Sequence, residues 1–411
     1  MRALVISDSH FGAWTGEDLL RQPEKLALLE PHLDVDEVIF LGDLFDFLFA
    51  EVKNALAAAG GLFDLLREKL QGKRFVFMEG NHDHDLVTRD AEALVGLELA
   101  LAGSSQGAGD ALRRADSVRR FLQQRLEGVE VEIRYPTYTF GDVLCTHGHY
   151  LDVHARQHGS GPDRLLGRVI WSIAVGGDHV PTLADYEATT TLLAGLLFTI
   201  AQLPNGTTAQ RRVYQGFETL HRAMRLSHSP RRALESIVDR ARPRMAASGG
   251  RLRTLESAYH HARSCERERL RRAGAPAGGE ASSFALGRRV RPSDPLERAV
   301  EAFEDVLTTL GWAQDTDKIV FGHTHQPLDG VTGPSGRWRY WNTGSWIYEP
   351  DLSSKRAYAA YVRNAWPGTA VLIDTDEPHP RLLRLLEHPS RSNGYPGDSD
   401  PEPLAALRGA R

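Results

Sequence analysis

Short apolar runs alternate with helix-like segments through the first third of the chain. Residues 3–6, 38–41 and 75–78 are almost wholly apolar, and each run has the length of a buried strand. Segments 23–30 and 55–70 lie between these runs and carry apolar residues at helical spacing. This alternation predicts consecutive strand and helix units of an α/β fold.

Each of these apolar runs ends in a cluster of polar residues. Two later runs, 138–146 and 318–321, end in the same way. The five polar clusters occupy residues 7–10, 42–43, 80–83, 147–149 and 322–325. Because ligand sites of open α/β sheets lie at the carboxyl ends of the strands, the pattern predicts one site built from five strand ends.

The remaining segments differ in composition. Between 152 and 310 the strand signal disappears and helical patterns dominate, apart from a Gly- and Ala-rich stretch at 273–287. The tail 376–411 is rich in Pro, Ser, Gly and charge, and we expect it to be loosely ordered. Antiparallel strands of a second sheet are predicted at 338–346, 357–362 and 369–373.

The composition is that of a folded globular protein. Apolar residues make up 41% and charged residues 25% of the 411 residues, which argues against a disordered or fibrous chain. The formal net charge of -5 gives no general attraction to nucleic acid, although Arg concentrates at 211–291. Cys145 and Cys265 form no CxxC motif, so we expect neither disulfides nor a thiolate zinc site, and we expect a cytoplasmic location.

No export signal or membrane span is predicted. Asp8 interrupts the N-terminal apolar run before the core of a signal peptide would be complete. The most apolar later stretch, 191–203, is shorter than the ~20 residues that a spanning helix needs. That stretch fits packing within a helical region and fits peripheral membrane contact equally well.

The first polar cluster has metal-binding chemistry. Asp8 and His10 stand at positions i and i+2, which project to the same side of an extended segment, although such a pair also fits an ordinary hydrogen bond. Asp43, Asn81 and His82 follow neighbouring strands, and the glycines before Asp43 and Asn81 let the backbone approach an ion closely. Carboxylate, carboxamide and imidazole groups together suit Mn, Fe or Zn, and the Asn carbonyl disfavours a structural zinc site.

Five short motifs occur in order along the chain: Asp8-x-His10, Gly42-Asp43-x-x-Asp46, Gly80-Asn81-His82-Asp83, His147-Gly148 and Gly322-His323-x-His325. In this order they resemble the motifs of the calcineurin-like metallophosphoesterases. The resemblance implies an α/β fold in which two mixed β-sheets form a four-layer α/β/β/α sandwich, with a helical insertion. On this interpretation residues 1–151 and 311–375 form the catalytic domain, 152–310 the helical insertion or cap, and 376–411 the tail.

The resemblance also implies which residues bind metal. The first ion would be held by Asp8, His10 and His325. The second would be held by Asn81, His147 and His323. The Asp43 carboxylate would bridge the two ions.

His82 is then not a metal ligand. In the family the equivalent His contacts the substrate phosphate and assists the leaving group, and the next residue, here Asp83, would orient its ring. We expect the other polar neighbours, Asp46, His84, Asp85 and His149, to form hydrogen bonds around the site rather than to bind metal. Segment 342–345 fits both a strand-end loop close to the metals and a plain Asn-x-Gly turn.

The expected activity is hydrolysis of a phosphoric ester by a hydroxide activated by two metal ions. Two cations about 3.5–4 Å apart bind phosphoryl oxygens, lower the pKa of a bridging water and stabilise the entering and leaving oxygens. We expect Mn first, with Fe, Zn, Ni or Mg as alternatives. The substrate would be a small-molecule phosphodiester, phosphomonoester or nucleotide-linked pyrophosphate. Whether this substrate is amphiphilic stays open.

The helical insertion and the Gly-His-Thr-His-Gln-Pro ending are similar to the UDP-2,3-diacylglucosamine pyrophosphatase branch. That branch typically has Arg where this chain has His82 and an acidic residue where this chain has His149. We therefore do not assign the substrate of that branch to this chain. Two alternatives remain: a catalytically silent scaffold or interaction protein with the same fold, and a nuclease of the same family. A nuclease would use the basic insertion, where the aromatic residues Tyr214, Phe217 and Tyr259 are widely spaced.

Overall fold

The computed structural model describes residues 1–13, 17–48, 50, 52–83, 121–158, 171, 175, 179–190, 295–350 and 355–387. The chain divides into two compact units. Unit 1 comprises Met1–His149 and Ala313–Arg411, and unit 2 comprises Tyr150–Trp312.

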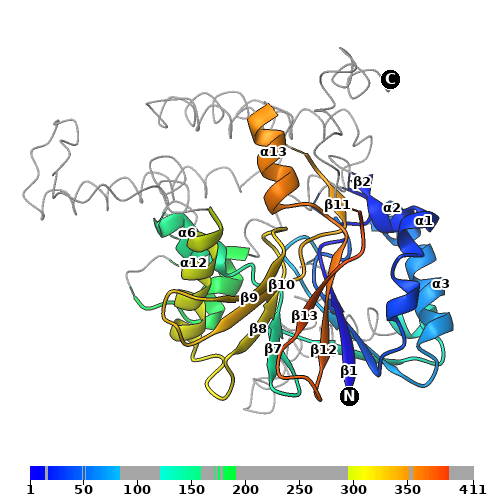
Figure 1. Ribbon diagram of the computed structural model, residues 1–411, viewed down its shortest axis with the longest axis horizontal. Coiled ribbons are helices and arrows are strands. Elements are labelled where there is room, and N and C mark those ends of the chain that lie inside the picture. The colour runs from blue at the N-terminus through cyan, green and yellow to red at the C-terminus, as the bar shows by residue number, and fades with distance from the viewer. Residues whose placement is uncertain are drawn as a thin grey trace, which may run out of the picture. The chain divides into compact units, whose positions relative to one another are not determined.

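Unit 1 contains two mixed β-sheets and a short ribbon (Figure 1). The six-stranded sheet, in the order β13-β12-β1-β3-β4-β5, consists of β1 (Arg2–Ile6), β3 (Glu37–Leu41), β4 (Arg74–Met78), β5 (Glu130–Arg134), β12 (Thr369–Asp374) and β13 (Arg381–Arg384). The five-stranded sheet, in the order β6-β7-β8-β10-β9, consists of β6 (Tyr138–Phe140), β7 (Val143–Thr146), β8 (Lys318–Phe321), β9 (Leu328–Thr332) and β10 (Arg339–Asn342). The ribbon pairs β2 (Glu17–Asp18) with β11 (Ile347–Tyr348).

The strands that carry the polar clusters are parallel within each sheet. In the larger sheet β1, β3, β4 and β5 are parallel, and only β12 and β13 run the other way. In the smaller sheet β7, β8 and β10 are parallel, flanked by the antiparallel β6 and β9. The carboxyl ends of the parallel strands therefore meet along one edge of each sheet, as the sequence pattern predicts.

One hydrophobic core joins the two sheets. Val5, Ile39 and Val76 of the larger sheet share this core with Val320 and Trp341 of the smaller one. The intervening residues of β1 and β3 are buried as well, so these strands are apolar on both faces, as expected of parallel strands covered on both sides. The sheets therefore pack face to face.

Helices lie on the other side of the larger sheet in Figure 1. These are α1 (Pro23–Leu26), α2 (Val52–Ala58) and α3 (Gly60–Lys69), with the 3-10 turns η1 (Leu19–Arg21) and η2 (Glu30–His32). In α3 the buried residues Leu62, Phe63 and Leu66 follow the i, i+1, i+4 spacing of one helical face.

The described part of unit 2 is helical. It contains α6 (Leu151–His158), a helix over 183–190 and α12 (Pro295–Leu310). In α12 the buried residues Val300, Phe303 and Leu307 form one apolar face, and α12 packs against α6. Among the described residues no helix is both long and apolar enough to cross a bilayer. The apolar stretch 191–203 and the Arg-rich segment 211–291 lie outside the described residues.

The structure corrects three expectations. Residues 357–362 belong to a helix, α13 (Lys355–Asn364), because Tyr358, Tyr361 and Val362 recur at the 3- and 4-residue spacing of a helix face. The strand in 338–346 is β10, which is antiparallel to β9, as expected, but parallel to its other neighbour β8. Part of the expected loose tail forms β13, which pairs with β12 and buries Leu382.

Candidate metal site

Backbone hydrogen bonds hold the strand-end loops of both sheets together. The Asp8 amide donates to the Gly42 carbonyl at 3.1 Å, which joins the loops after β1 and β3. The Gly322 amide donates to the His147 carbonyl at 3.0 Å, which joins the loops after β8 and β7. The His323 amide donates to the Asp8 carboxylate at 3.0 Å and so connects the two sheets. Loops far apart in sequence therefore form one rigid cluster.

The backbone is left-handed at most of the predicted ligands. Positive φ angles between 48° and 66° occur at Asp8, His10, Asp43, His323 and His325. Among the described non-glycine residues only Ala313 shares this conformation. Left-handed backbone is costly for such residues and persists where the surrounding structure enforces it, which is typical of functional sites.

Two motif glycines leave room for the carboxylates. A Cβ on Gly80 would lie 2.1 Å from Asp43 Oδ1, and a Cβ on Gly322 would lie 2.5 Å from Asp8 Oδ2. Both distances are far below van der Waals contact. The glycines are therefore required for the carboxylates to occupy their positions.

Asp8, His10 and His325 form the first group of potential ligands, with one donor atom from each within 4.8 Å of the others. His325 Nε2 lies 3.3 Å from Asp8 Oδ1, and His10 Nε2 lies 3.1 Å from His325 Nε2. Asp8 and His10 are buried. Two imidazole nitrogens and a carboxylate oxygen thus converge on one point.

Asp43, His147 and His323 form the second group. His147 Nδ1 donates to the Leu41 carbonyl at 2.6 Å, so its other nitrogen, Nε2, faces the centre of the group. This Nε2 lies 3.3 Å from Asp43 Oδ2 and 3.2 Å from Asn81 Oδ1. Asn81 Oδ1 therefore lies beside the second group, and its role as a ligand stays a prediction.

The donor atoms of both groups fit divalent cations. Burial favours neutral His147, but the Asp43 carboxylate raises the pKa of His147 to about 9, so without metal a proton on Nε2 faces the oxygens of Asp43 and Asn81. A divalent cation at this point would take the place of that proton. The mixture of nitrogen and oxygen donors is the set that Mn, Fe and Zn accept.

Asp43 lies between the two groups. Its Oδ2 atom is 3.3 Å from His147 Nε2 and 3.8 Å from His10 Nε2, so one carboxylate oxygen reaches the imidazoles of both. Its Oδ1 atom accepts the His82 amide at 2.7 Å. Burial opposes ionisation of Asp43, but the nearby His147 and His82 hold its pKa well below the usual value. Asp43 is therefore an anion in position to serve two cations.

His82 and Asp46 form an ion pair beside the ligand groups. His82 Nδ1 lies 2.9 Å from Asp46 Oδ1, and the His82 ring meets the His10 ring edge-on at 4.5 Å. Burial favours neutral His82, but the carboxylates of Asp43 and Asp46 raise its pKa to about 10. His10, Asp46 and His82 likewise offer one ligand atom each within 4.8 Å of one another, so they form a third potential metal group that shares His10 with the first.

Asp83 has a different role from the one expected. Its buried carboxylate accepts the amides of Gly80 at 2.7 Å and Leu44 at 2.8 Å, and so ties the loop after β4 to the loop after β3. The carboxylate hydrogen-bonded to the His82 ring is that of Asp46. We expected Asp83 to orient this ring, and the structure corrects that assignment because backbone amides surround Asp83.

Segment 342–345 satisfies both sequence interpretations. The Gly344 amide donates to Asn342 Oδ1 at 2.8 Å, which is Asn turn chemistry, and Asn342 Nδ2 donates to the Gly322 carbonyl at 2.7 Å beside the site.

The His149 ring lies 5.3 Å from the His147 ring and 6.4 Å from the His323 ring. His84 and Asp85 lie outside the described residues.

Sequence reasoning missed Ser7 and Glu349. The Ser7 hydroxyl contacts the Asp8 carboxylate and the Thr343 hydroxyl, and so ties the Asp8 side chain to the loop after β10. The position of Ser7, directly before the first motif, was a usable signal. Glu349 lies in no motif, and no sequence pattern indicated a role for this residue.

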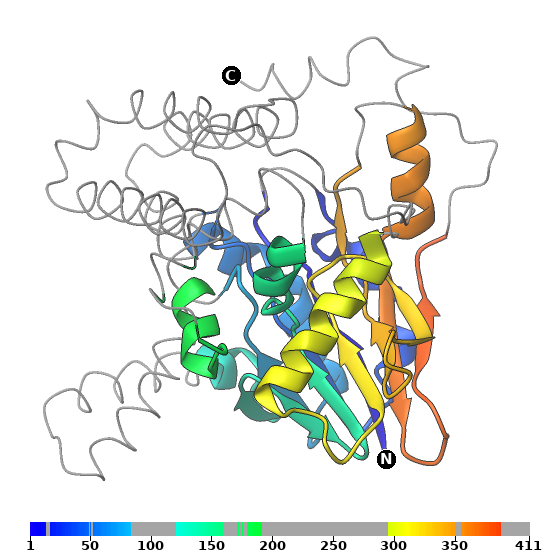
Figure 2. The same cartoon turned by 90° about the vertical axis from the view of Figure 1, so that its left-hand side faces the viewer.

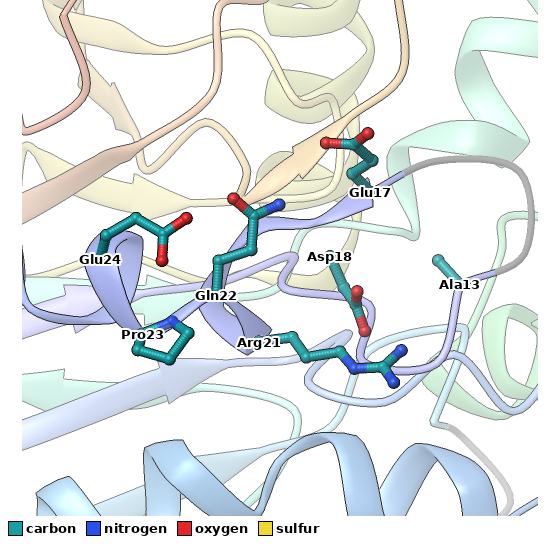
Figure 3. A pocket seen from close by; sticks show the side chains of 7 residues that line it. All are labelled: Ala13, Glu17, Asp18, Arg21, Gln22, Pro23 and Glu24. Atoms are coloured by element: carbon teal, nitrogen blue, oxygen red, sulfur yellow. The ribbon is translucent and has the colours of Figure 1, made fainter.

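Figure 3 shows a separate cavity of about 510 Å³ beside β2. Glu17, Asp18 and Glu24 line it together with Arg21, and none of the predicted metal ligands does. The Asp18 carboxylate accepts the Gly12 amide at 3.0 Å, so it fastens the loop after His10 to β2.

Comparison with known families agrees with this geometry. Residues 1–196 match the family model described as calcineurin-like phosphoesterase. A comparison with curated proteins gave no significant match. The matched range contains four of the five motifs, and the structure brings His323 and His325 of the fifth to the same cluster. Over residues 1–196 the chain is therefore similar to the calcineurin-like phosphoesterases, and its His and Asp groups support a metal-dependent phosphoesterase.

Proposed function

We propose that this protein hydrolyses a phosphoric ester with two divalent cations, Mn being the first choice. The observation that carries the proposal is the position of Asp43, whose Oδ2 atom reaches His10 of one ligand group and His147 of the other. A single shared carboxylate suits a dinuclear centre better than two unrelated sites.

The proposed ligands of the first ion are Asp8, His10 and His325, and those of the second are Asn81, His147 and His323, with Asp43 shared. Bound there, the ions supply the charge that binds phosphoryl oxygens and lowers the pKa of water toward neutrality. The protein contributes rigid positioning, since each ligand loop is fixed by hydrogen bonds to another loop.

His82 is the proposed general acid. Its pKa, raised to about 10 by Asp43 and Asp46, keeps it protonated near neutral pH, so it can contact a phosphoryl oxygen and donate a proton to the leaving oxygen. Asp46 holds the ring through Nδ1, which leaves Nε2 as the donor. Asp83 supports the same chemistry by fixing the loop that carries His82.

We also propose the finer domain organisation. The two packed sheets and the helices α1–α3 support three layers of the four-layer α/β/β/α sandwich. The helices α6 and α12 support a helical insertion at 152–310, with 1–151 and 311–375 as the catalytic domain.

A substrate screen tests the proposal. Metal-free protein, with and without Mn, is assayed against p-nitrophenyl phosphate, bis-p-nitrophenyl phosphate and a nucleotide-sugar diphosphate. We expect Mn-dependent hydrolysis of at least one ester and its loss in Asp43→Asn. No turnover with Mn, Fe, Zn, Ni or Mg would favour the silent scaffold, and equal rates before and after metal removal would exclude metal catalysis.

A further inference from the structure

Glu349 lies at the edge of the candidate site on a segment that the site itself holds in place. The Trp346 amide donates to the Asp8 carbonyl at 2.9 Å, so the chain leaves the metal-binding loop at Trp346. Three residues span at most about 11 Å, which keeps Glu349 near this loop. Glu349 is exposed.

Three aromatic rings cluster next to Glu349. Ring centroids of Tyr348 and Tyr361 are 5.9 Å apart, those of Tyr348 and Trp366 are 5.9 Å apart, and those of Tyr361 and Trp366 are 6.2 Å apart. The rings meet at steep angles of 66° to 79°, and all three are only partly buried. The Glu349 amide donates to the Tyr361 hydroxyl at 3.3 Å, so the backbone at Glu349 is held beside the rings.

This cluster lies at the same end of unit 1 as the ligand groups. Figures 1 and 2 both show α13, which carries Tyr361, beyond the end of the sheets opposite the start of β1. That is the end at which β1 delivers Asp8. A substrate bound through its phosphate at the ligand groups could therefore extend one ester group toward the cluster.

Two carboxylate residues lie beside Tyr348. Glu17 faces Tyr348 across the β2–β11 ladder, and Glu349 follows Tyr348 directly. Glu17 also lines the pocket in Figure 3, together with Asp18, Glu24 and Arg21. The helix α13, which carries Tyr361, has Arg363 in its last turn, so attraction for a cation comes from the carboxylates beside Tyr348.

We propose that Glu349, with the partly buried rings of Tyr348, Tyr361 and Trp366, forms a subsite for an organic ammonium group on one ester arm of the substrate. Aromatic faces attract alkylammonium groups through the ring quadrupole, and a neighbouring carboxylate adds direct Coulomb attraction. The inference rests on the proposed function and narrows the substrate to a zwitterionic phosphodiester.

A matched pair of esters tests the subsite. The substrates are p-nitrophenyl phosphorylcholine and p-nitrophenyl 3,3-dimethylbutyl phosphate, which have the same shape but differ in the ammonium charge. We expect wild type with Mn to prefer the choline ester in kcat/KM, and Glu349→Gln to reduce this preference about tenfold. Glu127→Gln, an exposed change before β5 at the opposite end of the larger sheet, should keep the preference.

The rings need their own variants. Tyr348→Phe keeps the aromatic face and should keep the preference, whereas Tyr348→Leu should lose it while the thermal midpoint stays within a few degrees. An equal preference in wild type and Glu349→Gln would overturn the subsite and leave the proposed function standing.

Binding of tetramethylammonium by calorimetry gives a readout independent of turnover. Saturable binding to wild type that weakens about tenfold in Glu349→Gln supports the subsite. If neither ester is hydrolysed, the missing turnover counts against the proposed function and leaves this binding result intact. Absence of saturable binding to wild type would overturn the subsite.

Discussion

The His82 ring and the Asp46 carboxylate are joined by a contact of 2.9 Å between Nδ1 and Oδ1. This pair separates the proposed general acid from the proposed ligands, although His82 directly follows Asn81 in sequence. The buried Asp46 carboxylate fixes one ring nitrogen, and with Asp43 it keeps the ring protonated. Proton donation and metal binding should therefore be separable by mutation.

Replacing His82 should remove the acid and spare the metals. We expect His82→Ala to keep its full metal content and to lower kcat by about 10²- to 10⁴-fold, the usual range for losing a positioned proton donor. Elemental analysis and steady-state kinetics measure the two effects. Substrates with good leaving groups should show a smaller defect. Loss of one ion would instead make His82 a ligand.

Replacing Asp46 should change the pH profile. A histidine whose pKa is raised holds its proton to higher pH, so activity that needs protonated His82 should persist toward pH 10 in wild type. Asp46→Asn removes one of the two carboxylates that raise this pKa, so the alkaline loss of kcat should move to lower pH. Asp64→Asn, on the exposed face of α3, is the control. An unshifted alkaline limb would argue against the pair.

Gly80 should tolerate no side chain. In Gly80→Ala the new Cβ would lie 2.1 Å from Asp43 Oδ1, so the shared carboxylate must move and metal content should fall. Gly60→Ala is the matched control, because nothing lies within 4 Å of its Cβ and the residue is helical. Circular dichroism checks that both variants fold. A Gly80→Ala protein with full metal content would contradict the proposed role of Asp43.

Away from the site, Tyr138 links the two sheets. Its hydroxyl donates to the buried Glu37 carboxylate at 3.1 Å, and Arg74 approaches the same oxygen at 3.4 Å. Tyr138→Phe removes a hydrogen bond to a charged group, so we expect a loss of about 1.5–3 kcal/mol in the free energy of unfolding. Denaturant titration measures it, and a double-mutant cycle with Glu37→Gln isolates the pair. Unchanged stability would show that Arg74 alone satisfies Glu37.

Much of the catalytic half was predictable from the sequence. Buried parallel strands read as continuous apolar runs, so β1, β3, β4 and β8 and the polar clusters after them were recognisable from residue type alone. Strand β5 was missed because its alternating Glu130, Glu132 and Arg134 resemble a surface segment, and its identity depends on pairing with β4. The edge strand β13 likewise depends on its neighbour β12.

The fine structure of the site was less predictable. Sequence order suggested Asp83 as the partner of His82, because the two are adjacent. The loop after β4 instead turns Asp83 toward backbone amides, and the loop after β3 brings Asp46 to the ring. Which of two carboxylates faces an imidazole depends on how two loops pack, and local sequence does not specify this.

Calorimetric titration of Mn into metal-free protein tests the proposed dinuclear centre, with Asp43→Asn titrated beside the wild type. We expect two ions per wild-type chain, and because Asp43 is shared, we expect Asp43→Asn to weaken the binding of both ions by more than about tenfold. A single ion per wild-type chain, or a variant that binds both ions with unchanged affinity, would contradict the shared dinuclear centre.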